Sequence, residues 1–197
     1  VSLVGSEMCI RDSPHPEIRN GYNKPAAGMF LDATFREGFA ELGKRDMSFE
    51  GWCFHHQISE LTDLAKAFPD TTIILDHFGG PLGIGPYAGK RDEVLADWKK
   101  KIAGLAACEN VVAKLGGINM KVNGFEWHKN SKPPTSEELC EATRPYYEYT
   151  IEQFGVDRCL FESNFPVDKL SCSYHTLWNS FKVLTANYSA GEKTKLY

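Results

Sequence analysis

Short apolar runs alternate with longer amphipathic segments along most of the chain. Four runs rich in apolar or β-branched residues predict strands, at Ser48–Phe54, Thr72–His77, Val111–Leu115 and Arg158–Ser163. A helix is expected after each of them, over about Ile58–Phe68, Asp92–Ala107, Ser136–Phe154 and Tyr174–Ala186, and an earlier helix over Asp32–Leu42. The first of these four helices carries the apolar stripe of a helix that covers a sheet, at Leu61, Leu64, Ala65 and Phe68.

The order of these elements predicts an α/β fold with parallel strands. Strands followed by helices, in series, are joined by right-handed crossovers, and both an open doubly wound sheet and an eightfold barrel have this order. No predicted strand is followed by the G-x-G-x-x-G turn of a dinucleotide-binding sheet. Polar residues do stand at the carboxyl ends of several strands, where a barrel builds its active site. We therefore predict a TIM-type (β/α)8 barrel, with about four of its βα units present.

His77 stands where the second predicted strand meets a Gly-rich loop, in Leu75-Asp-His-Phe-Gly-Gly-Pro81. In a barrel its imidazole would point into the mouth, where it could ligate a metal or orient a substrate carbonyl or a water. The alternative is a histidine that hydrogen-bonds a neighbouring strand. The residues alone leave both interpretations open.

The fourth predicted strand contains a carboxylate, Glu162, that needs an explanation. Side chains alternate across a strand, so Leu160, Glu162 and Asn164 would share one face, with Asn164 lining the mouth and Glu162 one layer beneath. A carboxylate inside a barrel is costly unless it is paired, protonated or bound to a cation, which makes Glu162 a candidate functional residue. The alternative is a structural ion pair with Lys114. Asp168 is expected to be a helix cap or a loop residue.

Other candidates would bind substrate. Lys114 is the only charged residue of its strand and could hold a carboxylate or polarise a carbonyl. Near the end of the first strand, Trp52, His55 and His56 could bind a sugar-like or aromatic acid. Only one of these two histidines can face the mouth, and the alternation of Trp52 and Phe54 favours His56.

Composition and charge exclude several classes of partner. The chain has 22 basic and 26 acidic residues, mixed along its length without a clustered basic face, so nucleic acid is not expected as a partner. No apolar run approaches the roughly 18 residues of a membrane span, and the start lacks the order of a signal peptide. The six cysteines form no C-x-x-C pair and are interpreted as buried free thiols. We expect a cytoplasmic protein that acts on a small-molecule substrate, and an oligomer is compatible with this composition.

Three segments resemble the amidohydrolase-related (amidohydrolase 2) family of TIM-barrel, predicted metal-dependent hydrolases, in its lactonase-like branch. Leu75–Pro81, Val112–Gly117 and Phe161–Pro166 resemble the motifs of the family's sixth, seventh and eighth strands, in that order. The resemblance covers residues 14–197 and implies that they form the C-terminal half of the barrel. It also implies four earlier strands with an H-x-H pair, which this chain does not contain.

The resemblance implies hydrolysis of a small lactone, by water attack on a carbonyl polarised by His77, Lys114 or a metal. Most of the family has Asp where this chain has Asn164, and an amide cannot accept a proton at neutral pH. Our hypothesis is that Glu162 supplies the carboxylate, acting on water directly or through Asn164, which positions the substrate. A divalent metal, zinc or manganese, with His77 as a ligand, stays open because a carboxamide is a weak ligand. The alternatives are a non-oxidative decarboxylase (a lyase) of an aromatic acid and a catalytically silent barrel fragment.

Both ends of the chain are expected to be unusual. Residues 1–13 show neither periodicity nor an initiator Met, so we leave them out of the fold prediction and expect a non-native extension. Ser189 and Glu192 form a capping box that opens a helix, and the chain ends about two turns later. Residues 14–197 are thus expected to be a partial domain, truncated at both ends. Half a barrel leaves unpaired strand edges, so we predict a chain that is poorly stable or that associates in solution.

Overall fold

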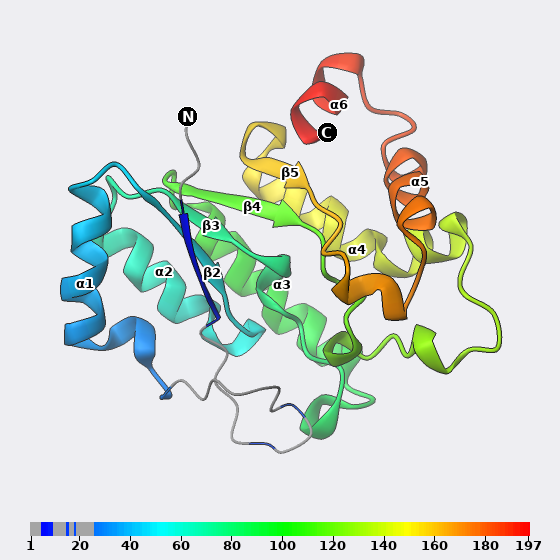
Figure 1. Ribbon diagram of the computed structural model, residues 1–197, viewed down its shortest axis with the longest axis horizontal. Coiled ribbons are helices and arrows are strands. Elements are labelled where there is room, and N and C mark those ends of the chain that lie inside the picture. Colours follow the sequence, from blue (N-terminus) through cyan, green and yellow to red (C-terminus); the bar gives the residue numbers. More distant parts are fainter. Residues whose placement is uncertain (1–4, 10–14, 16–17, 19–25) are drawn as a thin grey trace.

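The computed structural model describes residues 5–9, 15, 18 and 26–197, and its centre is one parallel sheet (Figure 1). Each strand pairs with the next one along the chain, in the order β1-β2-β3-β4-β5. Successive right-handed βα units give this order. The strands are β1 (Gly5–Cys9), β2 (Ser48–Trp52), β3 (Ile73–Leu75), β4 (Val111–Leu115) and β5 (Cys159–Phe161).

Helices alternate with the strands, as predicted, and α2, α3 and α4 lie side by side along one face of the sheet (Figure 1). The helices are α1 (Ala33–Gly43), α2 (Ile58–Ala67), α3 (Arg91–Ala106), α4 (Ser136–Phe154), α5 (Tyr174–Leu184) and α6 (Ala190–Leu196). The longest, α4, begins at a capping box: the Thr135 hydroxyl accepts from the Glu138 N–H, and the Glu138 carboxylate accepts from the Thr135 N–H. The bounds of α4 are those predicted from the sequence.

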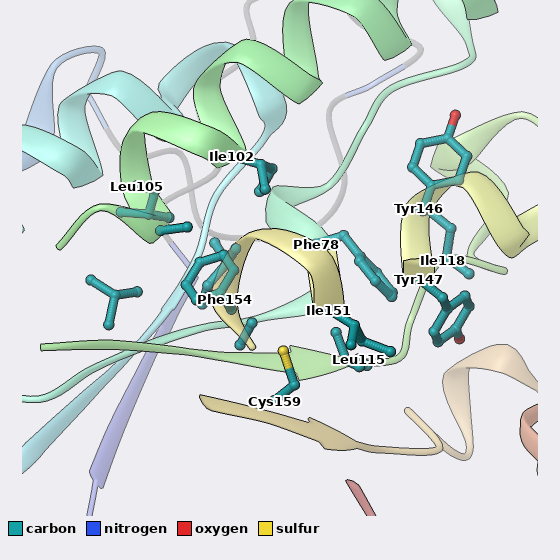
Figure 2. Packing of buried hydrophobic residues seen from close by; sticks show 14 of the residues in the cluster. Phe78, Ile102, Leu105, Leu115, Ile118, Tyr146, Tyr147, Ile151, Phe154 and Cys159 are labelled. Carbon is teal, nitrogen blue, oxygen red and sulfur yellow. The ribbon is translucent and has the colours of Figure 1, made fainter. Parts of the chain in front are cut away.

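The main core lies between the sheet and these helices. In β4, Val111, Ala113 and Leu115 are buried while the alternate residues are only half-buried, so one face of the strand packs on helices. Figure 2 shows Leu115 and Cys159 of the sheet facing Ile151 of α4. A valine, leucine or isoleucine side chain contributes about 1.5–3 kcal/mol when fully buried. Glu50 of β2 and Lys114 of β4 are therefore on the other face.

β1 lies within residues 1–13, which the fold prediction from the sequence left out. All five of its residues pair in parallel register with Ser48–Trp52 of β2. The sequence Gly-Ser-Glu-Met-Cys lacks the alternation of apolar and polar residues that marks a half-buried strand, so its pairing could not be anticipated. That residues 1–13 are non-native stays a prediction.

Three strands end earlier than the sequence predicts, for local reasons. β3 stops at Leu75 because His77 and Phe78 take φ values of 52° and 59° and enter a 3-10 turn, His77–Gly79. β2 stops at Trp52, shortly before another 3-10 turn at His55–Gln57. β5 stops at Phe161, before Asn164 takes a φ of 51°.

The cysteines and the apolar content of the helices were both considered from the sequence. Cys53, Cys108, Cys140, Cys159 and Cys172 are buried free thiols, as predicted. Within residues 5–9, 15, 18 and 26–197, no helix has the length and apolar content needed to cross a membrane.

Candidate active site

Two of the predicted catalytic residues meet at the carboxyl ends of the strands. His77 follows β3 and Glu162 follows β5, and both are placed by the parallel order of the sheet at the same edge. The Nδ1 atom of His77 lies 2.6 Å from the Oε1 atom of Glu162. Their side chains are 9% and 16% exposed, so the pair is largely shielded from water yet reachable from it.

A pair of glycines after β4 makes this contact possible. A Cβ atom at Gly116 would lie 2.4 Å from the Cγ atom of Glu162, and one at Gly117 would lie 2.5 Å from Nδ1 of His77. Real Cβ atoms are not found so close to other heavy atoms. Gly117 also has a φ of 75°, which disfavours any residue with a side chain. The strand-7 motif therefore leaves the space in which His77 and Glu162 meet.

Lys114 of β4 lies next to Glu162 of this pair, among three carboxylates. Its Nζ atom is 3.0 Å from Glu50 Oε2, 3.4 Å from Asp76 Oδ1 and 3.6 Å from Glu162 Oε2. Lys114 therefore pairs with carboxylates of the protein itself, and a role for it in binding substrate stays a prediction. The alternative to a functional role for Glu162 was a structural ion pair with Lys114. Glu162 does make this ion pair, and it also contacts His77.

The contacts set the charge of the pair. Burial alone would raise the pKa of Glu162, but His77 and Lys114 outweigh it, and the pKa lies below its usual value. Burial would lower the pKa of His77, but the Glu162 carboxylate outweighs it and the pKa ends above its usual value. The carboxylate is therefore ionised at neutral pH, and it stabilises the protonated imidazole.

Glu50 and Asp76 complete the cluster, and the sequence analysis did not select either of them. Asp76 is only 1% exposed. Burial raises its pKa to about 6, although the Lys114 ammonium acts in the opposite direction. One signal was available: both are carboxylates within or directly after predicted strands, as Glu162 is, and a carboxylate there needs a partner.

Asn164 points to a partner that was not anticipated, Asp168. The amide Nδ2 atom of Asn164 donates to Asp168 Oδ1 over 2.9 Å, and the backbone N–H of Asp168 donates to the Asn164 carbonyl over 3.2 Å. Asp168 lies in a 3-10 turn, Val167–Leu170, so it is a loop residue as expected, but its side chain has no exposed surface. Because Asn164 has a positive φ, the strand alternation that links Leu160 and Glu162 does not extend to it.

The aromatic residues at the end of β2 and just after it separate into two groups. The Trp52 ring lies edge-on to the His77 ring, 5.1 Å between centroids, and thus belongs to the site. His55 instead packs against Tyr87 at 4.9 Å, and its Nδ1 atom accepts from the Leu82 N–H. Burial lowers its pKa to about 4, so it is neutral. His56 is half-buried and 5.7 Å from the His55 ring.

The alternation that favoured His56 over His55 is a property of an extended strand, and the backbone is not extended here. His55–Gln57 form a 3-10 turn, in which side chains do not alternate between two faces. The structure therefore brings Trp52 to His77, while His55 joins the packing around the loop after β3. A role for either histidine in binding substrate stays a prediction.

The loops that carry the site are tied to one another. The Asn123 amide donates to the Pro81 carbonyl over 2.8 Å, which joins the loops after β4 and β3. The Ser171 hydroxyl donates to the Asn119 carbonyl over 2.6 Å, which joins the loops after β5 and β4. Such cross-links hold catalytic side chains in place.

The described residues do not by themselves form a metal site. No group of three or more His, Cys, Asp or Glu side chains in residues 5–9, 15, 18 and 26–197 is arranged to hold a metal ion. The Nδ1 atom of His77 faces Glu162, which leaves Nε2 as the one ring nitrogen for a ligand. Metal binding by His77 therefore stays a prediction.

Similar proteins were found by sequence and by structure. The "Uncharacterized protein y4mH" of Sinorhizobium fredii is 38% identical over 164 residues, which are 83% of this chain and 48% of that protein. An L-fucono-1,5-lactonase of Burkholderia multivorans is 27% identical over 143 residues, 73% of this chain and 45% of that enzyme. A crystal structure of an amidohydrolase from Burkholderia multivorans with bound zinc has a TM-score of 0.74 and 24% identity, and it is covered over 56% of its length by 86% of this chain.

These matches agree on the fold. The chain spans about half the length of the curated relatives it matches, and its parallel βα units overlay on part of an amidohydrolase barrel, as predicted. A family model described as amidohydrolase matches residues 12–197. The chain belongs to the amidohydrolase family.

Proposed function

We propose that the whole protein is a hydrolase that opens a small lactone by attack of water on the ring carbonyl. The observation that carries this proposal is the contact between His77 Nδ1 and Glu162 Oε1, at the strand ends where a barrel has its active site. The similarity to enzymes named L-fucono-1,5-lactonase supports a cyclic ester as the substrate.

In this mechanism Glu162 acts through His77. A carboxylate at Nδ1 keeps the proton on that nitrogen, so the lone pair of neutral His77 is on Nε2. Nε2 takes a proton from water as the water oxygen bonds to the lactone carbonyl carbon. The ring C–O bond then breaks, and the imidazolium returns the proton to the departing ring oxygen. The products are a hydroxyl and a carboxylic acid, which releases its proton at neutral pH.

The neighbouring residues have supporting roles. Lys114 faces three carboxylates, so its role is to hold Glu162 in place and not to polarise the substrate carbonyl. Our sequence-based hypothesis had Glu162 acting on water directly or through Asn164. The depressed pKa of Glu162 makes it a weak base, which favours its action through His77 instead. Asn164 would orient the water or the substrate, and the Trp52 ring would contact the substrate beside His77.

The test is a pH-indicator assay on the complete reading frame that contains this chain, with a panel of sugar and dicarboxylate lactones. We expect acid release that falls at least a hundredfold in His77→Asn. The matched control is His128→Asn, because His128 is exposed on the loop after β4. The assay is repeated with a chelator, and loss of activity there would show that a metal takes part.

Other results would reject the proposal. Release of CO2 from an aromatic acid, without lactone opening, would identify a decarboxylase. Binding of lactones without turnover would identify a catalytically silent protein. Full activity in His77→Asn would reject the mechanism while retaining the reaction.

A further inference from the structure

Asp168 carries a buried carboxylate that the turn around it does not need. The turn is held by the backbone, since the carbonyl of Asp168 accepts from the N–H groups of Ser171 and Cys172 over 2.9 and 3.2 Å. The side chain is completely buried, the Asn119 backbone N–H lies against its carboxylate, and the Oδ2 atom has no partner with full hydrogen-bond geometry among the described residues. Burying a carboxylate with an unsatisfied oxygen is costly, and an apolar side chain would fill the same space at lower cost. This cost points to a role outside the turn.

The one side chain that donates to this carboxylate within the described residues is Asn164, through Nδ2 over 2.9 Å. A primary amide has a donor end, NH2, and an acceptor end, the carbonyl oxygen. An ionised carboxylate can only accept, so it selects the orientation in which NH2 faces it. The carbonyl oxygen of Asn164 is then the end left for a water or a substrate hydroxyl.

We infer that Asp168 is a positioning residue, which fixes the Asn164 amide so that its carbonyl oxygen accepts from the water that His77 deprotonates. The inference rests on the proposed function for the identity of that water. Asp168 itself touches neither water nor substrate in this assignment. It acts by keeping an acceptor, and not a donor, at position 164.

Because Asp168 can change its protonation state near neutral pH, the orientation of the Asn164 amide should depend on pH. Burial raises the pKa of Asp168 to about 7, against the opposing effect of the Asn164 amide. The titratable groups that face Asp168 are His77 and Glu162 across the site, Tyr147 of α4, and Cys172 beyond the turn. A protonated carboxyl can donate to the amide oxygen of Asn164, and this would allow the amide to turn over.

The first test does not need an active enzyme. In 15N-labelled protein, the side-chain NH2 signals of Asn164 are assigned by their absence in Asn164→Asp and followed from pH 5 to 9. We expect them to shift with a midpoint near 7 in the wild type and not in Asp168→Asn. Signals that do not move, or that move equally in Asp168→Asn, would overturn the inference, because Asp168 would then not control the amide.

The second test separates positioning from folding. In Asp168→Asn we expect kcat for a lactone to fall tenfold or more, with the melting temperature within a few degrees of wild type. The matched control is Asp70→Asn, an exposed aspartate in the turn before β3, at the opposite end of that strand from His77. Loss of kcat only in proportion to loss of folded protein would overturn the inference.

A swapped pair gives a rescue. In the double variant Asn164→Asp with Asp168→Asn, the new amide at 168 can donate to a carboxylate at 164, which again places an acceptor in the site. We expect this variant to regain activity lost in Asp168→Asn, and no recovery would count against the inference. If the wild type opens no lactone, the proposed function fails, and the NMR titration still decides the role of Asp168.

Discussion

At the scale of single residues, the 2.6 Å contact between His77 and Glu162 makes the sharpest prediction. Replacing Glu162 with Gln removes the charge that raises the pKa of His77, so that pKa falls. Neutral His77 is the base in the proposed mechanism and is present above its pKa. We therefore expect the rising limb of the pH–rate profile to move to lower pH, while kcat falls by about 10²–10⁴.

Steady-state rates from pH 5 to 9 measure both effects of Glu162→Gln. The matched control is Glu152→Gln, because Glu152 is exposed on α4 and should leave the profile unchanged. A Glu162→Gln variant with wild-type turnover would remove this carboxylate from the mechanism.

Lys114 makes a prediction about stability. Replacing it with Met leaves Glu50, Asp76 and Glu162 without the cation they share, at a site where Lys114 is 22% exposed. We expect a loss of about 2–4 kcal/mol in unfolding free energy at pH 8. Without Lys114 the pKa of Asp76, which burial already raises to about 6 in the folded state, rises further above its unfolded value, so the loss should shrink as pH falls to 5 and Asp76 takes up a proton.

Urea unfolding at pH 8 and pH 5 measures this difference. Lys100→Met is the matched control, since Lys100 is exposed on α3. A loss that is equal at the two pH values would show that Lys114 acts through packing and not through charge.

Which individual residues could be recognised from the sequence depends on local geometry. Glu162 and Lys114 were found because each is a charge inside an apolar strand, where burial requires a partner. Asp168 was not, because it lies in a turn, and nothing in the spacing of turn residues indicates burial. The choice between His55 and His56 rested on alternation, which ends where the 3-10 turn begins, so it stays a prediction.

At the scale of elements, the glycines after β4 decide how closely the strand ends approach. A Gly117→Ala variant would place a methyl group 2.5 Å from His77 Nδ1, in a backbone with a φ of 75°. His77 must then move, so we expect a loss of about 1–3 kcal/mol in stability and a larger fractional loss of kcat. Thermal unfolding and turnover measure the two losses.

The matched control for Gly117→Ala is Gly104→Ala. Gly104 lies within α3, where nothing is within 4 Å of an added Cβ. Because Ala favours helix over Gly, this control should gain about 0.5–1 kcal/mol. A Gly117→Ala variant as stable and active as wild type would mean that the loop yields without moving His77.

Elements with strong local signals were predicted best. α4 has its capping box and β4 its alternation, and both occupy the predicted residues. β1 could not be predicted, because it depends on a contact between distant segments and not on its own residues. The backbone of β2 offers a free edge, to which the residues of β1 pair in register. β3 was predicted too long because positive φ values at His77 and Phe78 depend on the surrounding loops and not on their own residue types.

At the scale of the whole molecule, the open sheet makes the last prediction. β5 is the final strand in the sheet order of the described residues, and Leu160 at its centre is 38% exposed although it is an apolar strand residue. An exposed edge with an apolar side chain favours pairing with another chain. We expect residues 1–197 alone to elute in size-exclusion chromatography above the size of a 22.1 kDa monomer, increasingly so at higher concentration. Leu160→Lys should shift elution toward the monomer, since a charge there opposes pairing. Leu31→Lys is the matched control, because Leu31 is 52% exposed outside the sheet. A monomer that unfolds in one cooperative step at all concentrations would contradict the prediction and show that the edge of β5 is protected within the chain.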